Sequence, residues 1–308
     1  MSSVIARYAV LALVAATAPL GAQKTKAAAK APTAFSATAS VEAVLGRKGA
    51  PQPDGALKFA FPRSDLSVTV AGVPVKAGFA LGSWLGFADV GKGMAMVMGD
   101  LVLTEDEVES VMSTLQKGGI EQTALHHHIF NENPRVLYMH IRGHGNAAAL
   151  AAAIRAGLEE SHTPLGQPAT PSPAAIDIDT AGVARAIGYP GKANGAVFQF
   201  AVPRSETIRE SGHVIPVSLG IATAINFQST GDGKAAITGD FVLRGNEVNP
   251  VIRALRDHAI QVTSLHSHLL DEEPRIYFMH FWANDDAVTL AKGLRAALDQ
   301  TKSKKPKA

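Results

Sequence analysis

The chain has 308 residues, a formal net charge of +2 at pH 7 and no cysteine. This length allows two ordinary domains. The missing thiols exclude disulfides, thiolate metal sites, a cysteine nucleophile and a lipid-bearing cysteine. The basic surplus lies mostly in Lys24–Lys30 and in the C-terminal KSKKPKA, not on one face of a domain, which argues against a nucleic-acid partner.

The first residues have the pattern of a secretory signal peptide. Arg7 precedes an apolar run from Tyr8 to Leu20, and the small residues Gly21 and Ala22 follow. This order favours cleavage after Ala22, and the run is too short to span a bilayer. Residues 1–22 are predicted to be a signal peptide and 23–37 a linker. The mature protein is expected in a periplasm or outside the cell, without a membrane span.

An internal repeat organises the rest of the chain. Gly99 to Leu158 matches Gly239 to Leu298 without a gap, and FAFPRSD at Phe59 corresponds to FAVPRSE further on. Such self-similarity indicates two copies of one unit. Repeat domains are predicted over 38–160 and 176–302. A linker rich in proline, serine and threonine, 161–175, joins them, and a basic tail, 303–308, follows.

Each copy is expected to mix strands and helices. In the first copy, residues 55–72 alternate like strands, and GDLVL at Gly99 is a further strand. Thr104 and Glu107 form a capping box that opens a helix. Two strands around a turn at NENP and a last helix that carries Leu150, Ile154 and Leu158 complete the unit. The predicted fold class is α+β, with two tandem copies of a mainly antiparallel sheet and two helices packed largely on one face of each.

Histidines occupy matching positions in both copies. TALHHHIF begins at Thr123 and TSLHSHLL begins at Thr263, with a serine in place of the middle histidine. Residues two apart on a strand point to the same face. If the hairpin turns about Asn133, His126 pairs directly with His140 on the next strand. We therefore predict two converging trios, with His127 facing away. The candidate metal ligands are His126, His128 and His140 in the first copy and His266, His268 and His280 in the second.

Three imidazoles on one face are a known donor set for a divalent transition metal whose fourth coordination position is open, and zinc is the first candidate. Glu132 and Glu272 in the turns are candidate catalytic bases or further ligands. A structural role is the alternative, because paired strand histidines also hydrogen-bond one another or a buried carboxylate such as Asp100 or Asp240. Arg63 and Arg204, in matching PRS segments, are interpreted as solvated loop residues rather than an anion site.

The segment GDFVL…EVNPVIRAL…TSLHSHLLDEEPRIYFMHFWAND resembles the LppY/LpqO family, exported bacterial proteins built on a domain of unknown function. The resemblance covers nearly the whole mature chain in both copies. Members named as lipoproteins carry a lipidated cysteine, which this chain lacks. This chain also departs from the family's His-Asn-His pattern, because His127 and Ser267 stand at the middle position. The resemblance implies the duplicated fold and export, and it brings no reaction.

Three functions fit these observations. The first is an exported protein that binds a divalent metal through the histidines, with metal-dependent hydrolase as its candidate class. The second is a non-enzymatic envelope module that binds a small molecule or a cell-wall component between the copies. The third is a scaffold whose histidines only pack. An enzyme requires an open coordination position and a base facing it, whereas a binding module requires an apolar or aromatic cleft.

Overall fold

The computed structural model describes residues 33–167 and 176–305. The predicted signal peptide, most of the linker 23–37, residues 168–175 and the last three residues lie outside this described part. No helix within the described ranges is long and apolar enough to cross a membrane. The described residues of both repeats belong to one compact unit.

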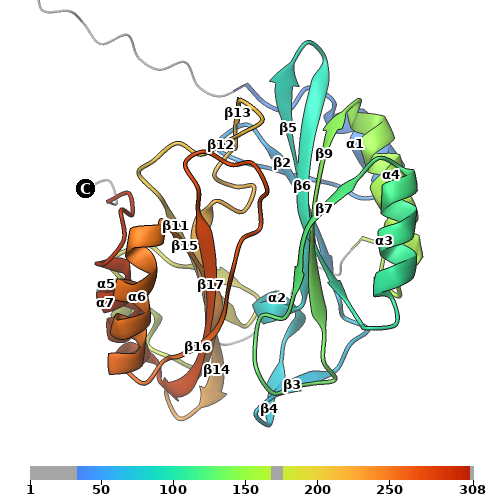
Figure 1. Ribbon diagram of the computed structural model, residues 1–308. Coiled ribbons are helices and arrows are strands. Elements are labelled where there is room, and N and C mark those ends of the chain that lie inside the picture. The colour runs from blue at the N-terminus through green and yellow to red at the C-terminus, as the bar shows by residue number, and fades with distance from the viewer. Residues whose placement is uncertain (1–32, 168–175, 306–308) are drawn as a thin grey trace, which may run out of the picture. The chain divides into compact units, whose positions relative to one another are not determined.

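The first repeat is built on a six-stranded antiparallel sheet in the order β1-β2-β5-β6-β9-β7. Helices α1, α3 and α4 pack together on one side of it (Figure 1). The strands are β1 (Ala50–Pro51), β2 (Leu57–Pro62), β5 (Gly82–Gly91), β6 (Met94–Leu103), β7 (Glu121–His126) and β9 (Leu137–Gly145). The helices are α1 (Thr38–Leu45), α3 (Val108–Lys117) and α4 (Ala147–Glu159). A short helix, α2 (Ala77–Ala80), and a small sheet of β3 (Val68–Val70), β4 (Val73–Val75) and β8 (Glu132–Asn133) complete it.

The second repeat has the corresponding strand order, β10-β11-β14-β15-β17-β16. Its strands are β10 (Lys192–Asn194), β11 (Val197–Pro203), β14 (Ala222–Gly231), β15 (Lys234–Leu243), β16 (Gln261–His266) and β17 (Tyr277–Asp286), with a side pair, β12 (Arg209–Glu210) and β13 (His213–Val214). Its helices are α5 (Thr180–Ile187), α6 (Gly245–Asp257) and α7 (Ala287–Leu298). The predicted tandem α+β fold is confirmed.

Each repeat also begins with a helix that the sequence analysis did not predict. These helices, α1 and α5, have eight residues each, and α1 buries only Val41 and Leu45. Two apolar residues one turn apart are too short a pattern to indicate a helix against the sequence background. Both helices end at a glycine in the left-handed conformation, Gly46 and Gly188, a common helix C-terminus.

Each sheet is buried on both faces. In β9, Met139 and Ile141 belong to the core under the helices. His140 and Arg142 alternate with them along the strand and therefore point to the opposite face. That opposite face is covered by the other repeat. Two apolar clusters contain residues of both repeats, one around Met98 and Phe278, the other around Tyr138 and Trp282.

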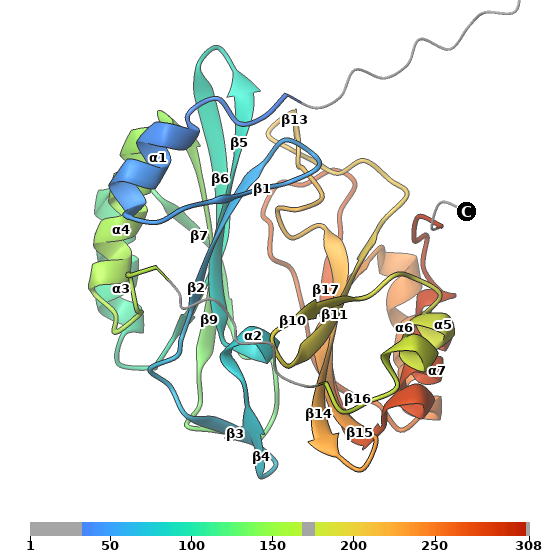
Figure 2. The same ribbon diagram turned by 180° about the vertical axis from the view of Figure 1, so that it is seen from behind.

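Hydrogen bonds reinforce the contact between the repeats. Gln199 on β11 donates to the carbonyl of Gly78 in α2 at 3.1 Å, and Asn226 on β14 donates to the carbonyl of Phe79 at 3.0 Å. Figure 2 shows α2 beside β10 and β11. Because the two repeats contribute equivalent patches, their contact resembles the isologous interface of a two-fold symmetric dimer.

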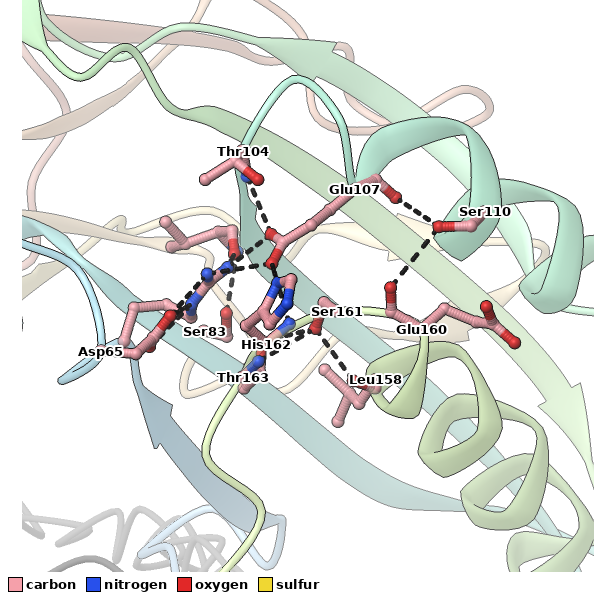
Figure 3. Close-up of polar contacts among 12 residues, drawn as sticks. Asp65, Ser83, Thr104, Glu107, Ser110, Leu158, Glu160, Ser161, His162 and Thr163 are labelled. Carbon is pink, nitrogen blue, oxygen red and sulfur yellow. Dashed lines mark hydrogen bonds and ion pairs between the residues drawn. The ribbon is translucent and has the colours of Figure 1, made fainter.

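A buried ion pair fixes the end of β2 to the start of α3. Arg63 is fully buried, and its Nη1 donates to Glu107 at 2.8 Å and to the Val102 carbonyl at 2.7 Å. Glu107 also accepts from the backbone N–H groups of Thr104 and His162 (Figure 3). The second repeat has the same arrangement, between Arg204 and Glu247 at 2.6 Å.

The interpretation of Arg63 and Arg204 as solvated loop residues is therefore wrong. Both arginines are buried, and their charge is neutralised within each repeat. The partner glutamate lies more than forty positions away in the chain, so local sequence does not reveal the pair.

Candidate metal centre

The histidine strands pair two residues away from the predicted register. His126 on β7 lies opposite Tyr138 on β9, and Ala124 lies opposite His140, after a bulge between Gln122 and Ala124. The predicted direct pair of His126 with His140 is therefore wrong. The strands are joined by a wider loop, in which β8 pairs with β3. A slip of two residues leaves every side chain on its predicted face.

Each trio of histidines nevertheless converges. One ligand nitrogen from each of His126, His128 and His140 lies within 4.8 Å of the others. A second group with the same spacing consists of His266, His268, His280 and again His126. The predicted convergence of the side chains is confirmed, and it includes a histidine from the opposite repeat.

The two trios meet face to face at the contact between the repeats. The ring centroids of His126 and His266 are 3.7 Å apart. His128 lies 3.8 Å from His280, and His140 lies 3.6 Å from His268. His128 is equivalent to His268 and His140 to His280, so the repeat relation converts one of the last two pairs into the other. This is expected for a pseudo-two-fold contact. The sequence pattern predicts one site in each repeat, whereas the structure brings all six rings into one cluster.

The ring nitrogens are oriented for ligation. His280 Nδ1 lies 2.9 Å from the Gly239 carbonyl, His126 Nδ1 lies 3.3 Å from the His127 carbonyl, and His266 Nδ1 contacts the Ser264 hydroxyl. When Nδ1 donates in this way, the lone pair of Nε2 is left free. Among the described residues, the buried Nε2 atoms of four histidines have no hydrogen-bond partner: His126, His128, His140 and His280.

Burial keeps the six rings neutral. It lowers the pKa of His126 to about 4 and that of His266 to about 3. Burial, followed by the neighbouring imidazoles, lowers the pKa of the other four well below 6.5. Neutral imidazole is the form that binds a metal ion.

Two aspartates accompany the histidines. Asp100 Oδ1 lies 3.7 Å from His140 Nε2, and Asp240 Oδ2 lies 3.7 Å from His268 Nδ1. Burial raises the pKa of Asp100 to about 7 and that of Asp240 well above 3.8. The Oδ1 atom of each has no partner within the described part of the chain. These aspartates were expected only as structural partners of the histidines, although their repeated position after a glycine in both copies was a usable signal.

The two glutamates belong to neither of the two histidine groups. Glu272 accepts from the backbone N–H of Ile276 at 3.0 Å and faces Arg275 at 3.3 Å, which closes its turn. Glu132 is buried, and its Oε1 lies 3.5 Å from the Tyr138 hydroxyl. Burial raises the pKa of Glu132 to about 7. Their role as catalytic bases stays a prediction.

Aromatic rings on β9 and β17 stack on two of the histidines. Tyr138 stacks on His128 with centroids 3.3 Å apart, and Phe278, at the equivalent position, stacks on His268 at 3.7 Å. His127, predicted to face away, is in neither group of possible metal ligands; its ring contacts the Val136 carbonyl and Arg135.

A cleft of about 1310 Å³ between the repeats leads to the centre. Strands β2 and β5 contribute one wall, and β11 and β14 the other. The residues of the centre that line it are Asp100, His128, His140, Asp240, His268 and His280. The centre is therefore open to a ligand from the cleft.

A family model described as Domain of Unknown Function (DUF1259) matches the chain twice, over residues 39–160 and 181–300. The chain belongs to this family. Each DUF1259 copy contains one histidine trio and one of the two aspartates. A comparison with curated proteins finds no match.

Two solved structures are similar to the chain: a trimeric bacterial microcompartment shell protein, PduB, at 14% identity, and EtuB from Clostridium kluyveri, at 6% identity. In both cases 80% of this chain and 87% of the other are covered, with a TM-score of 0.19. A TM-score this low supports no statement about fold or function.

Proposed function

We propose that the chain is a metalloprotein that holds a divalent transition metal between its two DUF1259 copies, with zinc as the leading candidate. The observation that carries this proposal is that the histidines form two groups of converging ring nitrogens, and that four of these histidines have a buried Nε2 without a partner in the described part of the chain. A buried polar atom without a partner is costly and rare. A metal ion would satisfy these nitrogens, and imidazole with carboxylate is a donor set that suits zinc.

The centre contains two overlapping donor sets that share His126. One set consists of the first trio, and the other consists of the second trio with His126. Metal analysis of purified, untagged protein tests the proposal directly. We expect at least one equivalent of zinc per chain, and a second equivalent only if His126 serves one ion while the remaining trio holds the other. A protein that stays metal-free after incubation with zinc contradicts it.

The proposed reaction class is metal-dependent hydrolysis. The centre lies on a cleft large enough for a small organic substrate. Asp100, with its pKa near neutrality, has the proton affinity that suits a general acid or base. A bound metal would supply a Lewis acid and an activated water. A panel of ester, amide and phosphoester substrates tests this class, with metal-free protein as the control.

A binding module without catalysis is the second candidate. Trp84, Phe79 and Tyr138 line the cleft, and aromatic walls are typical of small-molecule sites. A ligand that stabilises the metal-loaded protein and is recovered unchanged would favour this function, whereas turnover would favour the hydrolase.

The proposal also includes export and membership of the LppY/LpqO family. The basic residue, apolar run and small residues before Gln23 support export, and the long repeated segment supports the family. Expression with the native N-terminus followed by N-terminal sequencing tests export. We expect mature protein that begins at Gln23 in the periplasmic or extracellular fraction.

A further inference from the structure

One wall of the cleft carries a lysine without a matching charge. Lys58 lies on β2, and its ammonium sits 4.1 Å from the centre of the Trp84 ring. Within the described part of the chain, the Lys58 ammonium has no carboxylate within 4.0 Å and no hydrogen bond. Lys58 is half-buried, and drawing a charge partly out of water without an ion pair is unfavourable; such groups gather at functional sites.

The nearby carboxylates do not fill this position. Both oxygens of Asp54 accept from Ser218, one from its backbone N–H and one from its hydroxyl, each at 2.8 Å. Burial lowers the pKa of Lys58 to about 8, against the opposing effect of Asp54 and Asp100. The ammonium is thus mostly charged at pH 7. The other lysines that line the cleft, Lys76 and Lys304, are exposed.

Trp84, on the neighbouring strand of the same wall, holds this lysine in place. A Cβ atom added to Gly220 of the second repeat would lie 3.3 Å from two ring atoms of Trp84, so the indole is packed against that backbone. Attraction between an ammonium and an indole face fixes the lysine on this ring.

The second repeat lacks this cation. Gln199 occupies the position of Lys58, and Ala224 occupies that of Trp84. The Gln199 amide is used by Gly78 and Asn226. The histidine centre is nearly symmetric, while the strand position of Lys58 carries a cation in the first repeat only.

The lysine and the centre share one sheet face. Ala60 on β2, Trp84 on β5, Asp100 on β6 and His140 on β9 are successive register partners. Lys58 is two residues from Ala60 and therefore on the same face. Three strand spacings separate β2 from β9, roughly 14 Å at the backbone. A small inorganic anion at Lys58 would not reach the histidines.

We propose that Lys58, supported by Trp84, binds the oxyanion of an organic ligand, a carboxylate or a phosphate, whose other end reaches the histidine centre. The part of this inference that concerns the centre rests on the proposed metal function. It assigns the ligand class as an organic anion and fixes its direction in the cleft, with the anionic group at the first repeat.

Trp84 itself provides the readout. The chain has two tryptophans, so Trp282→Phe leaves Trp84 as the only indole. Titration of this variant with acetate and, separately, inorganic phosphate is expected to change the Trp84 emission in a saturable way, and the stronger of the two identifies the oxyanion. Lys58→Gln, which copies the second repeat, should weaken this binding by about 10- to 100-fold. Lys58→Arg should retain most of it.

Metal content separates this inference from the proposed function. Lys58→Gln should keep the wild-type metal content. If anion binding depends on Lys58 but the protein takes up no zinc, the anion site is supported and the metal centre is contradicted. Metal-loaded protein whose emission responds to neither anion, or responds equally in Lys58→Gln, overturns the anion site. If Trp282→Phe does not fold, calorimetric titration of wild type against Lys58→Gln gives the same comparison.

Discussion

The Nε2 atoms of His266 and His268 lie 2.7 Å apart at the end of β16. Two ring nitrogens at this distance share a single proton or face a common metal ion, because two protons between them would clash. Since burial lowers the pKa of His266 to about 3, the pair does not accept a second proton near pH 7. This pair is therefore the most direct place to test for a bound ion.

His268→Ala is expected to remove one donor and open a gap beside His140. Loss of an outer-shell partner of a metal ligand typically costs 10- to 100-fold in affinity, so loss of a ligand should cost at least about 100-fold. Zinc affinity measured by competition with a chelator checks this prediction. His127→Ala is the matched control, because that ring contacts Val136 and Arg135 outside both groups. Unchanged affinity in His268→Ala would remove this histidine from the centre.

The metal-free protein should lose stability as the pH falls from about 6.5 to about 4. An unfolded histidine binds a proton near pH 6.5, whereas folded His126 does so only near pH 4 and His266 near pH 3. In this window the unfolded chain binds more protons at all six rings, so the free energy of unfolding rises with pH. Asp100, Asp240 and Glu132, whose pKa values burial raises, act in the opposite direction.

Six histidines outnumber these three carboxyl groups, so the net effect is destabilisation by acid. Thermal unfolding of chelator-treated protein between pH 7.5 and pH 4.5, followed by circular dichroism, measures it. His126→Ala should show a shallower dependence, because one proton-binding difference is removed. A melting temperature that is constant or rises on acidification would contradict the neutral, buried state of the cluster.

The repeat and the strand faces could be predicted from the sequence because both follow from periodicity. The convergence of His126, His128 and His140 survived a wrong register, since the error was an even number of residues. What covers the histidine face could not be read in this way. Alternation assigns residues to a face, and only the fold shows that the face of each sheet is buried by the other repeat.

Other site features were missed for a different physical reason. Lys58 and Trp84 have no counterpart in the second repeat, so the duplication does not mark them as candidate site residues. Asp100 is in a repeated position, but its proximity to the rings depends on the order β5-β6-β9, which sequence patterns do not fix. A rule that would have helped is that two helices on one face leave the second face of a sheet in need of cover.

Glu107→Ala should destabilise the first repeat strongly. It removes the buried carboxylate partner of Arg63, which keeps only its pair with the partly exposed Asp65 at 2.7 Å, and the acceptor for the N–H groups of Thr104 and His162. Breaking a buried pair by removing one partner costs about 3–5 kcal/mol. Urea unfolding measures the loss, with the exposed neighbour Asp106→Ala as the control, expected within about 0.5 kcal/mol of wild type. A loss as small as that of the control would show that Arg63 is solvated after the change.

Gly239→Ala tests how the sheet supports the metal centre. A Cβ at Gly239 would overlap the Ala224 carbonyl oxygen on β14 and lie 2.9 Å from Phe281 Cζ. The backbone must then move, and overpacking of this kind costs about 1–3 kcal/mol. The same residue precedes Asp240, and its carbonyl lies 2.9 Å from His280 Nδ1. A shift there should also weaken zinc binding by about 10- to 100-fold, as for other changes behind a metal ligand.

Gly166→Ala is the control for Gly239→Ala, because a Cβ at Gly166 meets nothing within 4 Å. Both variants are compared by urea unfolding and by competition for zinc. Loss of stability with unchanged zinc affinity in Gly239→Ala would mean that the His280 ring keeps its orientation without the Gly239 carbonyl. Loss of both, with Gly166→Ala equal to wild type, is the expected result, since β15 carries Asp240 and supports the His280 ring through the same peptide.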